Sequence, residues 1–349
     1  MQAVHEMNAT LRPARATANE AVRTMRAIVH PQYGAPDVLQ LAEVERPIPG
    51  DDDVLVRVHA AGVNIGDHHV VTGKPYLIRL SPFGGLPRPR NRVPGACLAG
   101  RVEAVGAQVT SLRVGDEVFG QALTGAFAEY VVVPAALLAP RPSNLSLQDA
   151  AAVPWGATAL QGLRDAGGLR AGQRVLIVGA SGGVGTWAVQ IGKALGAHVT
   201  AVCSARNVEM VRDLGADDVI DYETQDFVVG GARFDVVFDL IGERPLPELR
   251  SVLKPGGAYV ACAGGGGDWV GPIFRLLGGL VSFLFSSQRF KTFVAAPRRD
   301  DLLFLKELVE VGKAKPVIER RYPLAQVGEA LRHVGAGHAQ GQTILRVVD

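Results

Sequence analysis

The sequence predicts an α/β protein in two parts, a β-rich domain followed by a doubly wound parallel sheet. Two observations lead to this fold class. Short alternating apolar segments separated by turn residues fill the chain up to about residue 133, and strand-like and helix-like segments alternate from Arg174 onward. With 349 residues, the chain is long enough for two domains that each have a hydrophobic core.

The β-rich domain is predicted to begin at Met25 and to run to residue 149. Its strand-like segments are 25–41, 54–63, 101–105, 117–119 and 126–133. Residues 1–24 precede it and contain both Arg12 and Glu6 but no apolar stretch of the kind found in secretory signals. We therefore expect residues 1–24 to form a flexible leader that the folded part does not need.

The parallel sheet is predicted within residues 150–289. Apolar residues at helical spacing over 149–166 lead into it. The predicted strands are 174–178, 198–202, 218–221, 235–239 and 258–262, with helical segments between them. The apolar stretch 273–285 is too short to span a bilayer, and we expect a buried helix or strand there.

Residues 290–349 are predicted to return to the first domain. Helices are expected over 300–311 and 324–334, and strands over 316–322 and 343–348. The strand predicted over 343–348 lies outside the alternating strands and helices of the second domain. Its position indicates that the chain returns to the first sheet. A ligand cleft would then lie between the two domains.

Composition excludes several classes of partner. The formal net charge is +2 with 20% charged residues, which favours neither a nucleic acid nor a membrane partner. The three cysteines are far apart and lack CxxC spacing, so they form neither a disulfide framework nor a zinc site. We expect a cytoplasmic protein in a reducing compartment.

A dinucleotide site is predicted where the alternation begins. The apolar run 174–178 is followed by a turn in which Ala180, Gly182 and Gly185 have the spacing of a dinucleotide fingerprint, and then by a helix. Small residues there let a pyrophosphate approach the amide groups at the helix N-terminus.

The cofactor is predicted to be NADPH. An NAD enzyme would place Asp or Glu after the second strand to bind the ribose hydroxyls. Ser204 and Arg206 stand there instead, and a hydroxyl and a guanidinium can bind a 2′-phosphate. Lys193 and Tyr222 are placed to reach the same phosphate, although each has a plain surface or packing role as an alternative.

Longer motifs give the chain a family resemblance. They are GVNIGD at 62–67, VGDEVFG at 114–120, GAFAEYVVVP at 125–134, VPWGATALQGL at 153–163, GASGGVG at 179–185 and LGADDVIDY at 214–222. The chain resembles the zinc-independent quinone oxidoreductase branch of the medium-chain dehydrogenase/reductase superfamily. Within it the likeness is to bacterial relatives of the mitochondrial reticulon-interacting NADPH oxidoreductase. The resemblance implies a GroES-like catalytic domain, a Rossmann NADPH-binding domain and a homodimer.

The resemblance also implies site residues. Asn64 and Asp67 match residues of the nicotinamide and substrate pocket, and Thr158 matches a threonine at its nicotinamide end. The remaining cofactor positions are the turn residues Ser181, Gly182, Gly183 and Val184, the 2′-phosphate residues Ser204, Arg206 and Tyr222, and Ala263 and Gly264 beside the nicotinamide.

Two departures from the family pattern bear on the pocket. Cys97 stands where family members usually carry Asp, and Gln342 ends GHAQGQ at 337–342 where the family favours GHARGK. Both departures remove a charge from positions that are usually charged. They bear on the electrostatics of the pocket and on the substrate that it accepts.

The metal ligands of zinc alcohol dehydrogenases are missing from the aligned positions. Asn64 and the Ala96–Cys97 pair stand there, and the adjacent His68 and His69 would point in different directions. Without a Lewis acid, an acceptor that is already electrophilic is the better substrate. The sequence therefore predicts hydride transfer to a quinone or an α,β-unsaturated carbonyl.

Asn64 is the predicted hydrogen-bond donor to the acceptor oxygen, and Tyr76 is the candidate hydroxyl or proton donor. A packing aromatic is the alternative for Tyr76, and a cap within its own loop is the alternative for Asn64. Two other functions remain open at this point: an alcohol dehydrogenase or pathway-specific enoyl reductase, and a non-catalytic NADPH-binding protein.

Overall fold

The computed structural model describes residues 23–81, 84–229, 231, 233–262, 271–337 and 339–348. Most of the predicted leader, residues 1–22, lies outside the described residues, as do Ala263 and Gly264 of the predicted cofactor site. The first described strand begins at Thr24, one residue before the predicted start of the folded part.

The first domain is built on a seven-stranded sheet. Its strand order is β14-β15-β3-β4-β5-β7, and β6 pairs with β3. The strands are β3 (Asp53–Val63), β4 (Cys97–Val105), β5 (Glu117–Gln121), β6 (Tyr130–Pro134), β7 (Leu138–Pro140), β14 (Ile318–Pro323) and β15 (Gln342–Arg346). A separate antiparallel pair is formed by β1 (Thr24–Val29) and β2 (Gln40–Glu45).

The C-terminal segment joins this first sheet. β15 pairs antiparallel with β3, with Thr343 opposite Val63, and β14 lies parallel to β15 at the edge. The helices α2 (Ile65–Thr72) and α10 (Val327–Gly335) pack against each other beside these strands. The C-terminal segment therefore lies next to α2, the helix that follows Asn64 of the predicted substrate pocket.

The second domain holds a six-stranded parallel sheet in the order β10-β9-β8-β11-β12-β13, which confirms the predicted fold class. The strands are β8 (Arg174–Val178), β9 (His198–Cys203), β10 (Asp218–Asp221), β11 (Phe234–Asp239), β12 (Leu253–Ala261) and β13 (Arg289–Thr292). The helices around it are α5 (Gly183–Ala194), α6 (Val208–Asp213), α7 (Leu246–Ser251) and α8 (Gly271–Phe283). β13 is a sixth strand that the sequence pattern did not predict.

Burial explains why the central strand is uniformly apolar. Val175, Leu176 and Ile177 of β8 are all fully buried, because helices cover both faces of a parallel sheet. Because three consecutive residues are buried, neither face of the strand contacts solvent, and its sequence is a continuous run of apolar residues.

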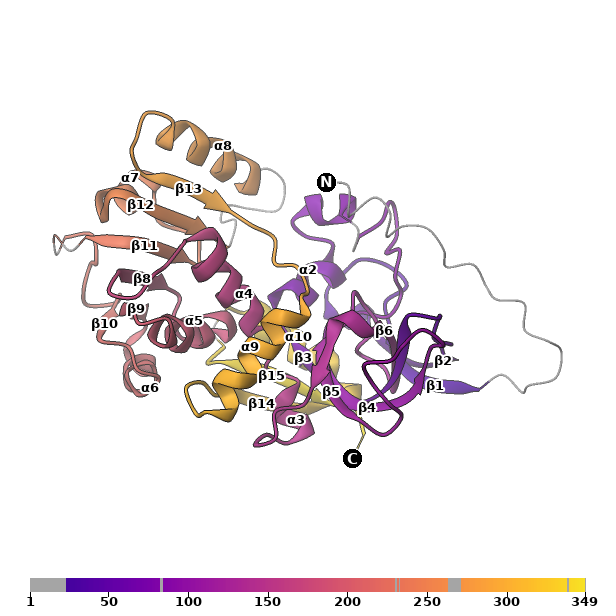
Figure 1. Ribbon diagram of the computed structural model, residues 1–349. Helices are drawn as coiled ribbons and strands as arrows, with labels where there is room; N and C mark the ends of the chain where they lie inside the picture. The colour runs from indigo at the N-terminus through magenta and orange to yellow at the C-terminus, as the bar shows by residue number, and fades with distance from the viewer. Residues whose placement is uncertain are drawn as a thin grey trace.

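Short helices connect the two domains. The segment with helical spacing over 149–166 consists of α3 (Leu147–Ala150), α4 (Gly156–Leu160) and a π-helical turn, Gln161–Ala166. α4 and α9 (Arg299–Glu310) lie between the two domains (Figure 1). A Cβ on Gly156 would lie 2.8 Å from a methyl of Leu305, so α4 approaches α9 closely only because this residue is glycine.

The prediction that the apolar stretch 273–285 is buried holds for Phe283 and is wrong for most of the other described side chains. Leu280 is 54% exposed and Val281 is 72% exposed on α8. The helix packs on the sheet through Phe283, whose ring stacks with Tyr259, while the opposite apolar face points to solvent. Within the described part of the chain, no helix is long and apolar enough to cross a membrane.

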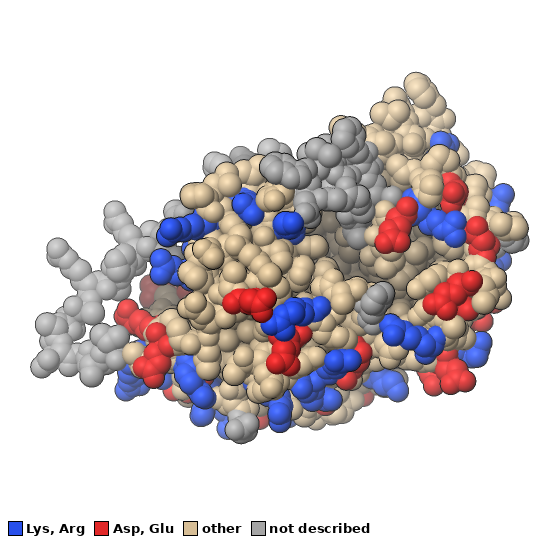
Figure 2. Space-filling view, turned by 180° about the vertical axis from the view of Figure 1, so that it is seen from behind, with Lys and Arg blue, Asp and Glu red and all other residues tan. Residues whose placement is uncertain are grey.

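Charged side chains of both signs are interspersed over the face of the molecule seen in Figure 2. No large area of a single sign is visible there. This agrees with a formal net charge of only +2.

Candidate active site

The predicted pyrophosphate turn has the expected strand, turn and helix. β8 ends at Val178, Gly179 has a φ of 86°, and α5 begins at Gly183 with no side-chain cap. A Cβ on Gly185 would lie 2.2 Å from the Gly179 oxygen, so the close turn requires glycine at position 185. The uncapped amide groups at the start of α5 fit an anionic pyrophosphate.

A cavity of about 440 Å³ lies beside this turn and brings together several predicted residues. Ser181, Ser204, Arg206 and Tyr222 all line it. Ser204 lies in the loop after β9 and Tyr222 directly follows β10, so parallel strand ends place both side chains at the same edge of the sheet. Tyr222 is 55% exposed, which leaves its ring open to a ligand.

Asn207 also lines this cavity, and sequence reasoning did not single it out. Its Nδ2 donates to Ser204 Oγ at 3.0 Å, which holds the hydroxyl in place. Its Oδ1 is buried without a hydrogen-bond partner in the described structure. Asn207 lies only three residues after Ser204 in the sequence, but only the fold shows that its side chain turns back toward the serine.

Arg244 is a second cation at the cavity that the sequence did not indicate. Its guanidinium pairs with Asp226 at 3.1 Å and with Glu248 at 3.0 Å. Its charge is therefore matched by two carboxylates. Lys193, the other cation that the sequence places near the phosphate, pairs with Asp217 at 2.7 Å and is not among the residues that line the cavity.

The C-terminal strap, residues 337 and 339–342, lies against the pyrophosphate turn. The amide of Gly341 donates to the Ser181 oxygen at 2.8 Å, and Gln342 Nε2 donates to the Gly183 oxygen at 3.3 Å. Gly337 and Ala339 line the 440 Å³ cavity. Gln342, which departs from the family pattern, therefore contacts the start of α5 directly.

A smaller cavity of about 260 Å³ holds the predicted acceptor-site residues Asn64, Asp67 and Thr158. Asn64 and Asp67 belong to the start of α2, and Thr158 comes from α4. The other lining residues are Gly66, Val70, Ile78, Gly95, Ala96, Gln121, Ala122, Leu123, Thr124, Trp155, Ala295 and Pro297. The cavity is therefore mostly apolar with a few polar groups, as small-molecule sites commonly are.

Asn64 and Asp67 form a reciprocal cap at the start of α2. Asn64 Oδ1 accepts from the Gly66 amide at 2.5 Å, and Asn64 Nδ2 donates to Asp67 Oδ2 at 2.5 Å. Asp67 Oδ2 also accepts from the Asn64 amide at 3.0 Å. Because a carboxamide has two donor hydrogens, the second Nδ2 hydrogen of Asn64 is left to donate elsewhere.

Burial raises the pKa of Asp67 from 3.8 to about 7, although the hydrogen bond from the Asn64 amide lowers it. The side chain is only 6% exposed, so its charged form is poorly solvated. At neutral pH, Asp67 is therefore present in both its protonated and its ionised form.

Cys97, the other residue that departs from the family pattern, is fully buried next to this cavity. Gln121 Nε2 donates to its sulfur at 3.5 Å. Burial raises the pKa of the Cys97 thiol well above its usual value, and the charge on Asp67 raises it further. The thiol stays neutral, which favours a packing role over a nucleophilic one.

The structure does not bring Tyr76 into the lining of this cavity. Tyr76 begins the 3-10 helix Tyr76–Leu80, and the Arg79 guanidinium lies 4.7 Å from the centre of its ring. Ile78 from the same turn contacts the cavity instead.

Metal ligands are not gathered in this region. The rings of His68 and His69 lie 6.1 Å apart at a steep angle, as expected for adjacent residues. Among the residues that the structure describes, no three or more His, Cys, Asp or Glu side chains are placed together to hold a metal ion.

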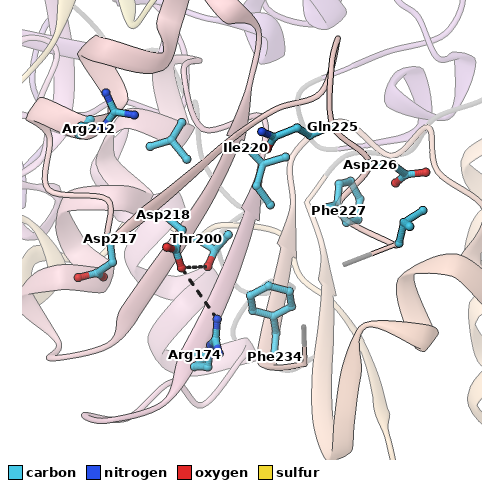
Figure 3. A pocket seen from close by; sticks show the side chains of 12 residues that line it. Arg174, Thr200, Arg212, Asp217, Asp218, Ile220, Gln225, Asp226, Phe227 and Phe234 are labelled. Carbon is cyan, nitrogen blue, oxygen red and sulfur yellow. Dashed lines mark hydrogen bonds and ion pairs between the residues drawn. The ribbon is translucent and has the colours of Figure 1, made fainter. Parts of the chain in front are cut away.

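A larger depression of about 810 Å³ lies elsewhere, on the outer side of the nucleotide sheet (Figure 3). Asp218 accepts a hydrogen bond from Thr200 at 3.3 Å, and Arg174 lies 3.9 Å from the same carboxylate. None of the predicted site residues lines this depression. The residues predicted for the cofactor and the acceptor instead line the two smaller cavities.

Comparisons with known proteins agree with this arrangement. The alcohol dehydrogenase GroES-like domain matches residues 50–143, and the zinc-binding dehydrogenase family matches residues 214–345. The mitochondrial NAD(P)H oxidoreductase RTN4IP1 of Danio rerio is 33% identical over 93% of this chain and 92% of its own length. This chain belongs to the quinone oxidoreductase branch of the medium-chain dehydrogenase/reductase superfamily. The predicted family resemblance is thereby confirmed.

Two further relatives support the same family. The chloroplastic NADPH-dependent alkenal/one oxidoreductase of Arabidopsis thaliana is 32% identical over 93% of this chain and 80% of its own length. The structure of the quinone oxidoreductase from Coxiella burnetii has a TM-score of 0.82 and 27% identity, and covers 93% of this chain and 100% of that one. The chain is an oxidoreductase of the quinone oxidoreductase type with a nicotinamide cofactor.

Proposed function

We propose that this oxidoreductase uses NADPH to reduce quinones and α,β-unsaturated carbonyls by direct hydride transfer, without a metal ion. The observation that carries the proposal is the content of the 260 Å³ cavity. It holds a carboxamide, Asn64, and a carboxyl group, Asp67, whose pKa is near neutrality. Acceptors that are already electrophilic need a hydrogen bond and a proton, and do not need a Lewis acid.

The cofactor cavity supports NADPH over NADH. The bound cofactor supplies a hydride. Ser204 and Arg206 lie where a 2′-phosphate would be placed, and Asn207 orients the serine hydroxyl. The amide groups at the start of α5 hold the pyrophosphate, and the strap supports the turn through the hydrogen bond from the Gly341 amide to the Ser181 oxygen.

The acceptor oxygen gains negative charge when its conjugated carbon or quinone ring is reduced. The second Nδ2 hydrogen of Asn64 donates to that oxygen, and protonated Asp67 delivers the proton that completes the reduction. Asp67 takes over the donor role that the sequence analysis gives to Tyr76, because Asp67 lines the cavity and Tyr76 does not. Bulk solvent reprotonates Asp67 between turnovers.

The names of the relatives support these acceptor classes. Quinone oxidoreductases and an alkenal/one oxidoreductase are among the proteins that this chain resembles. An alcohol dehydrogenase would have to polarise an unactivated carbonyl, and the described residues offer no cluster of metal ligands for that task. A concave site with a near-neutral carboxyl group also favours an enzyme over a non-catalytic NADPH-binding protein.

We also propose that the protein forms a homodimer and that it is located in a reducing compartment. Leu277, Leu280, Val281 and Leu284 form an exposed apolar stripe near the edge strand β13, and a second copy would cover it. The three cysteines are free thiols, which supports a cytoplasmic location.

The test is anaerobic oxidation of NADPH and of NADH in the presence of a quinone, an enone and a simple aldehyde, with zinc measured on the same sample. The proposal expects turnover with NADPH for the quinone and the enone, and less than one zinc per chain. Turnover with the aldehyde alone would favour the alcohol dehydrogenase, and no turnover would favour the binding protein. One tightly bound zinc whose removal abolishes activity would refute the metal-free mechanism.

A further inference from the structure

Gln161 is a buried amide one helical turn beyond Thr158 that neither the sequence analysis nor the proposed mechanism uses. It is only 3% exposed, and it begins the π-helical turn Gln161–Ala166. Turns of this kind often occur at functional sites. Gln161 follows Thr158 by three residues, so the two are neighbours on the helix surface. Thr158 lines the acceptor cavity and Gln161 does not.

The amide of Gln161 binds one residue of the crossover between the two domains. Its Nε2 donates to the Ala296 oxygen at 2.7 Å, and its Oε1 accepts from the Ala296 amide at 3.0 Å. The backbone of Ala296 is therefore held at both polar atoms by a single side chain. Segment 293–298 has no regular secondary structure of its own.

The residues on either side of Ala296 line the acceptor cavity. Ala295 and Pro297 both belong to its wall, together with Asn64, Asp67 and Thr158. In an extended segment, residues two apart point to the same side, and the residue between them points away. The backbone contact at Ala296 thus fixes the two neighbours that face the acceptor.

An ionic network whose buried member is Asp301 holds Gln161 itself. Its Nε2 also donates to Asp301 Oδ2 at 2.7 Å, and Arg164 donates to the other oxygen of Asp301 at 2.7 Å. Asp301 is 1% exposed, and Arg298 at the end of the crossover pairs with Asp165 at 3.0 Å. Both hydrogens and the oxygen of the Gln161 amide are used, so only a carboxamide of this length satisfies all three partners.

We propose that Gln161 is a positioning residue for the acceptor: by clamping Ala296, it sets the distance of the Ala295–Pro297 wall from Asn64, Asp67 and Thr158. It thereby selects for acceptors of limited width. The size selection rests on the proposed function, namely that the 260 Å³ cavity holds the acceptor. The clamp itself rests only on the contacts described here.

The chain contains a matched control for this clamp. Gln190 on α5 is 5% exposed, its Nε2 donates to the Lys315 oxygen at 3.0 Å, and its Oε1 accepts from the Lys315 amide at 2.8 Å. It makes the same two backbone bonds as Gln161, and it also donates to the Thr186 oxygen at 3.0 Å. Neither Gln190 nor Lys315 lines the acceptor cavity.

The experiment compares Gln161→Met with Gln190→Met. Both variants lose three buried hydrogen bonds, so both should melt at a lower temperature. In Gln161→Met, kcat/KM for a narrow enone should fall by roughly tenfold or more, and that for a bulky enone should fall less, because the wall is displaced. In Gln190→Met, the ratio of kcat/KM for the narrow enone to kcat/KM for the bulky enone should equal the ratio in the parent.

Amide hydrogen exchange supplies a readout that does not depend on turnover. Peptides covering 293–298 should exchange faster in Gln161→Met and at the parental rate in Gln190→Met. Peptides covering 313–318 should exchange faster in Gln190→Met and at the parental rate in Gln161→Met. An unchanged acceptor ratio or unchanged exchange at 293–298 in Gln161→Met would overturn the proposal. If the parent reduces no acceptor, the proposed function fails, and exchange alone decides the clamp.

A second variant covers the case in which Gln161→Met does not fold. Pro297→Gly changes the same wall and leaves the buried amide in place, so it should move the acceptor ratio in the same direction. A parental ratio in Pro297→Gly would show that this wall does not select acceptors.

Discussion

Asn64 serves the fold and the candidate site with different atoms of one side chain. Its oxygen accepts from the Gly66 amide, and one Nδ2 hydrogen binds Asp67, so the capping role considered as an alternative is present in the structure. The side chain also lines the acceptor cavity. The two roles are separable, because capping lowers the free energy of the folded state and donation to the acceptor lowers the barrier to reaction.

Replacing Asn64 with Ala should remove both roles. We expect stability to fall by about 1 kcal/mol, the usual effect of losing an N-cap, and turnover to fall by about ten- to a thousandfold. NADPH affinity should change little. Ser146→Ala is the control, because Ser146 caps α3 by accepting from the Asp149 amide at 3.1 Å and does not line the cavity.

Turnover and melting temperature measured on the same samples distinguish the roles. Ser146→Ala should melt lower and keep full turnover per folded molecule. If Asn64→Ala behaves in the same way, Asn64 is only a cap and the proposed donor is wrong.

Arg206 is predicted to set the preference for NADPH. Arg206→Ala should weaken NADPH binding by about 1.5–3 kcal/mol, the scale of a hydrogen bond to a charged group, and scarcely affect NADH. Arg212→Ala is a suitable control, because Arg212 lines the outer depression and not the cofactor cavity. Equal dissociation constants for NADPH and NADH in the parent, measured by titration, would contradict the assignment.

Asp67 should make both stability and turnover depend on pH. Its pKa is about 7 in the folded protein against an ordinary 3.8, so the folded state keeps its proton to a higher pH than the unfolded chain. The free energy of unfolding therefore decreases as pH rises from about 4 to about 7, and the loss is complete above about 7. Turnover should also decline above about pH 7, where the proton donor is ionised.

Asp67→Asn removes this titration. Chemical denaturation across pH should show that the variant lacks the decrease carried by Asp67, and its lower turnover should no longer decline above neutrality. Parallel stability curves for parent and variant would show that Asp67 is not protonated in the folded protein.

Some properties of the site residues follow from local sequence, and others depend on distant parts of the fold. Ser204 and Arg206 could be predicted, because their positions follow from the end of a strand in a known supersecondary pattern. The near-neutral pKa of Asp67 could not, because it depends on burial by segments far away in the chain. Tyr76 is close to Asn64 in sequence, yet the 3-10 turn that it begins directs Ile78 to the cavity instead.

At the scale of elements, the strap links the C-terminus to the cofactor turn. Glu319 Oε2 accepts from the Gln340 amide at 2.8 Å and lies 2.8 Å from His333 Nε2, so β14 and α10 both support the strap. Gly341 has a φ of 85°, and a Cβ there would lie 2.4 Å from the Val317 oxygen. Only glycine lets the strap reach the Ser181 oxygen in this conformation.

Gly341→Ala should therefore weaken cofactor binding as well as stability. The control is Gly312→Ala, because Gly312 has a φ of 72° but a Cβ at that position would meet nothing within 4 Å. Both variants lose roughly 1 kcal/mol of stability to the left-handed conformation, and Gly341→Ala must also displace Val317 or the strap. We expect a weaker NADPH dissociation constant in Gly341→Ala alone, measured by fluorescence titration, and equal constants in the two variants would contradict the role of the strap.

Elements with strong patterns were predicted well. The strands at 174–178 and 218–221 coincide with β8 and β10, since short runs with β-branched residues at their centre, bounded by turn residues, favour strands. β13 was missed, because Arg289, Lys291 and Thr292 are exposed and give no apolar period. α8 was recognised as apolar, but the sequence could not show that one of its apolar faces would remain uncovered.

At the scale of the whole molecule, the chain crosses between the domains twice, and the acceptor cavity lies at these crossings. The first crossing runs through α4, and the second lies just before α9 (Figure 1). Thr158 and Gln161 belong to the first crossing, and Ala295 and Pro297 belong to the second. The two-domain division could be predicted from the change in pattern along the chain. The contact between the crossings could not, because it joins residues 135 positions apart in sequence.

The proposed reaction transfers a hydride directly from NADPH to an electrophilic acceptor. The decisive experiment supplies NADPH deuterated at the transferring position, together with an enone, and analyses the product by mass spectrometry. Direct hydride transfer places one deuterium on the carbon β to the carbonyl and a hydrogen from solvent on the α carbon. A reduced product without deuterium, or no reduced product at all, would contradict it.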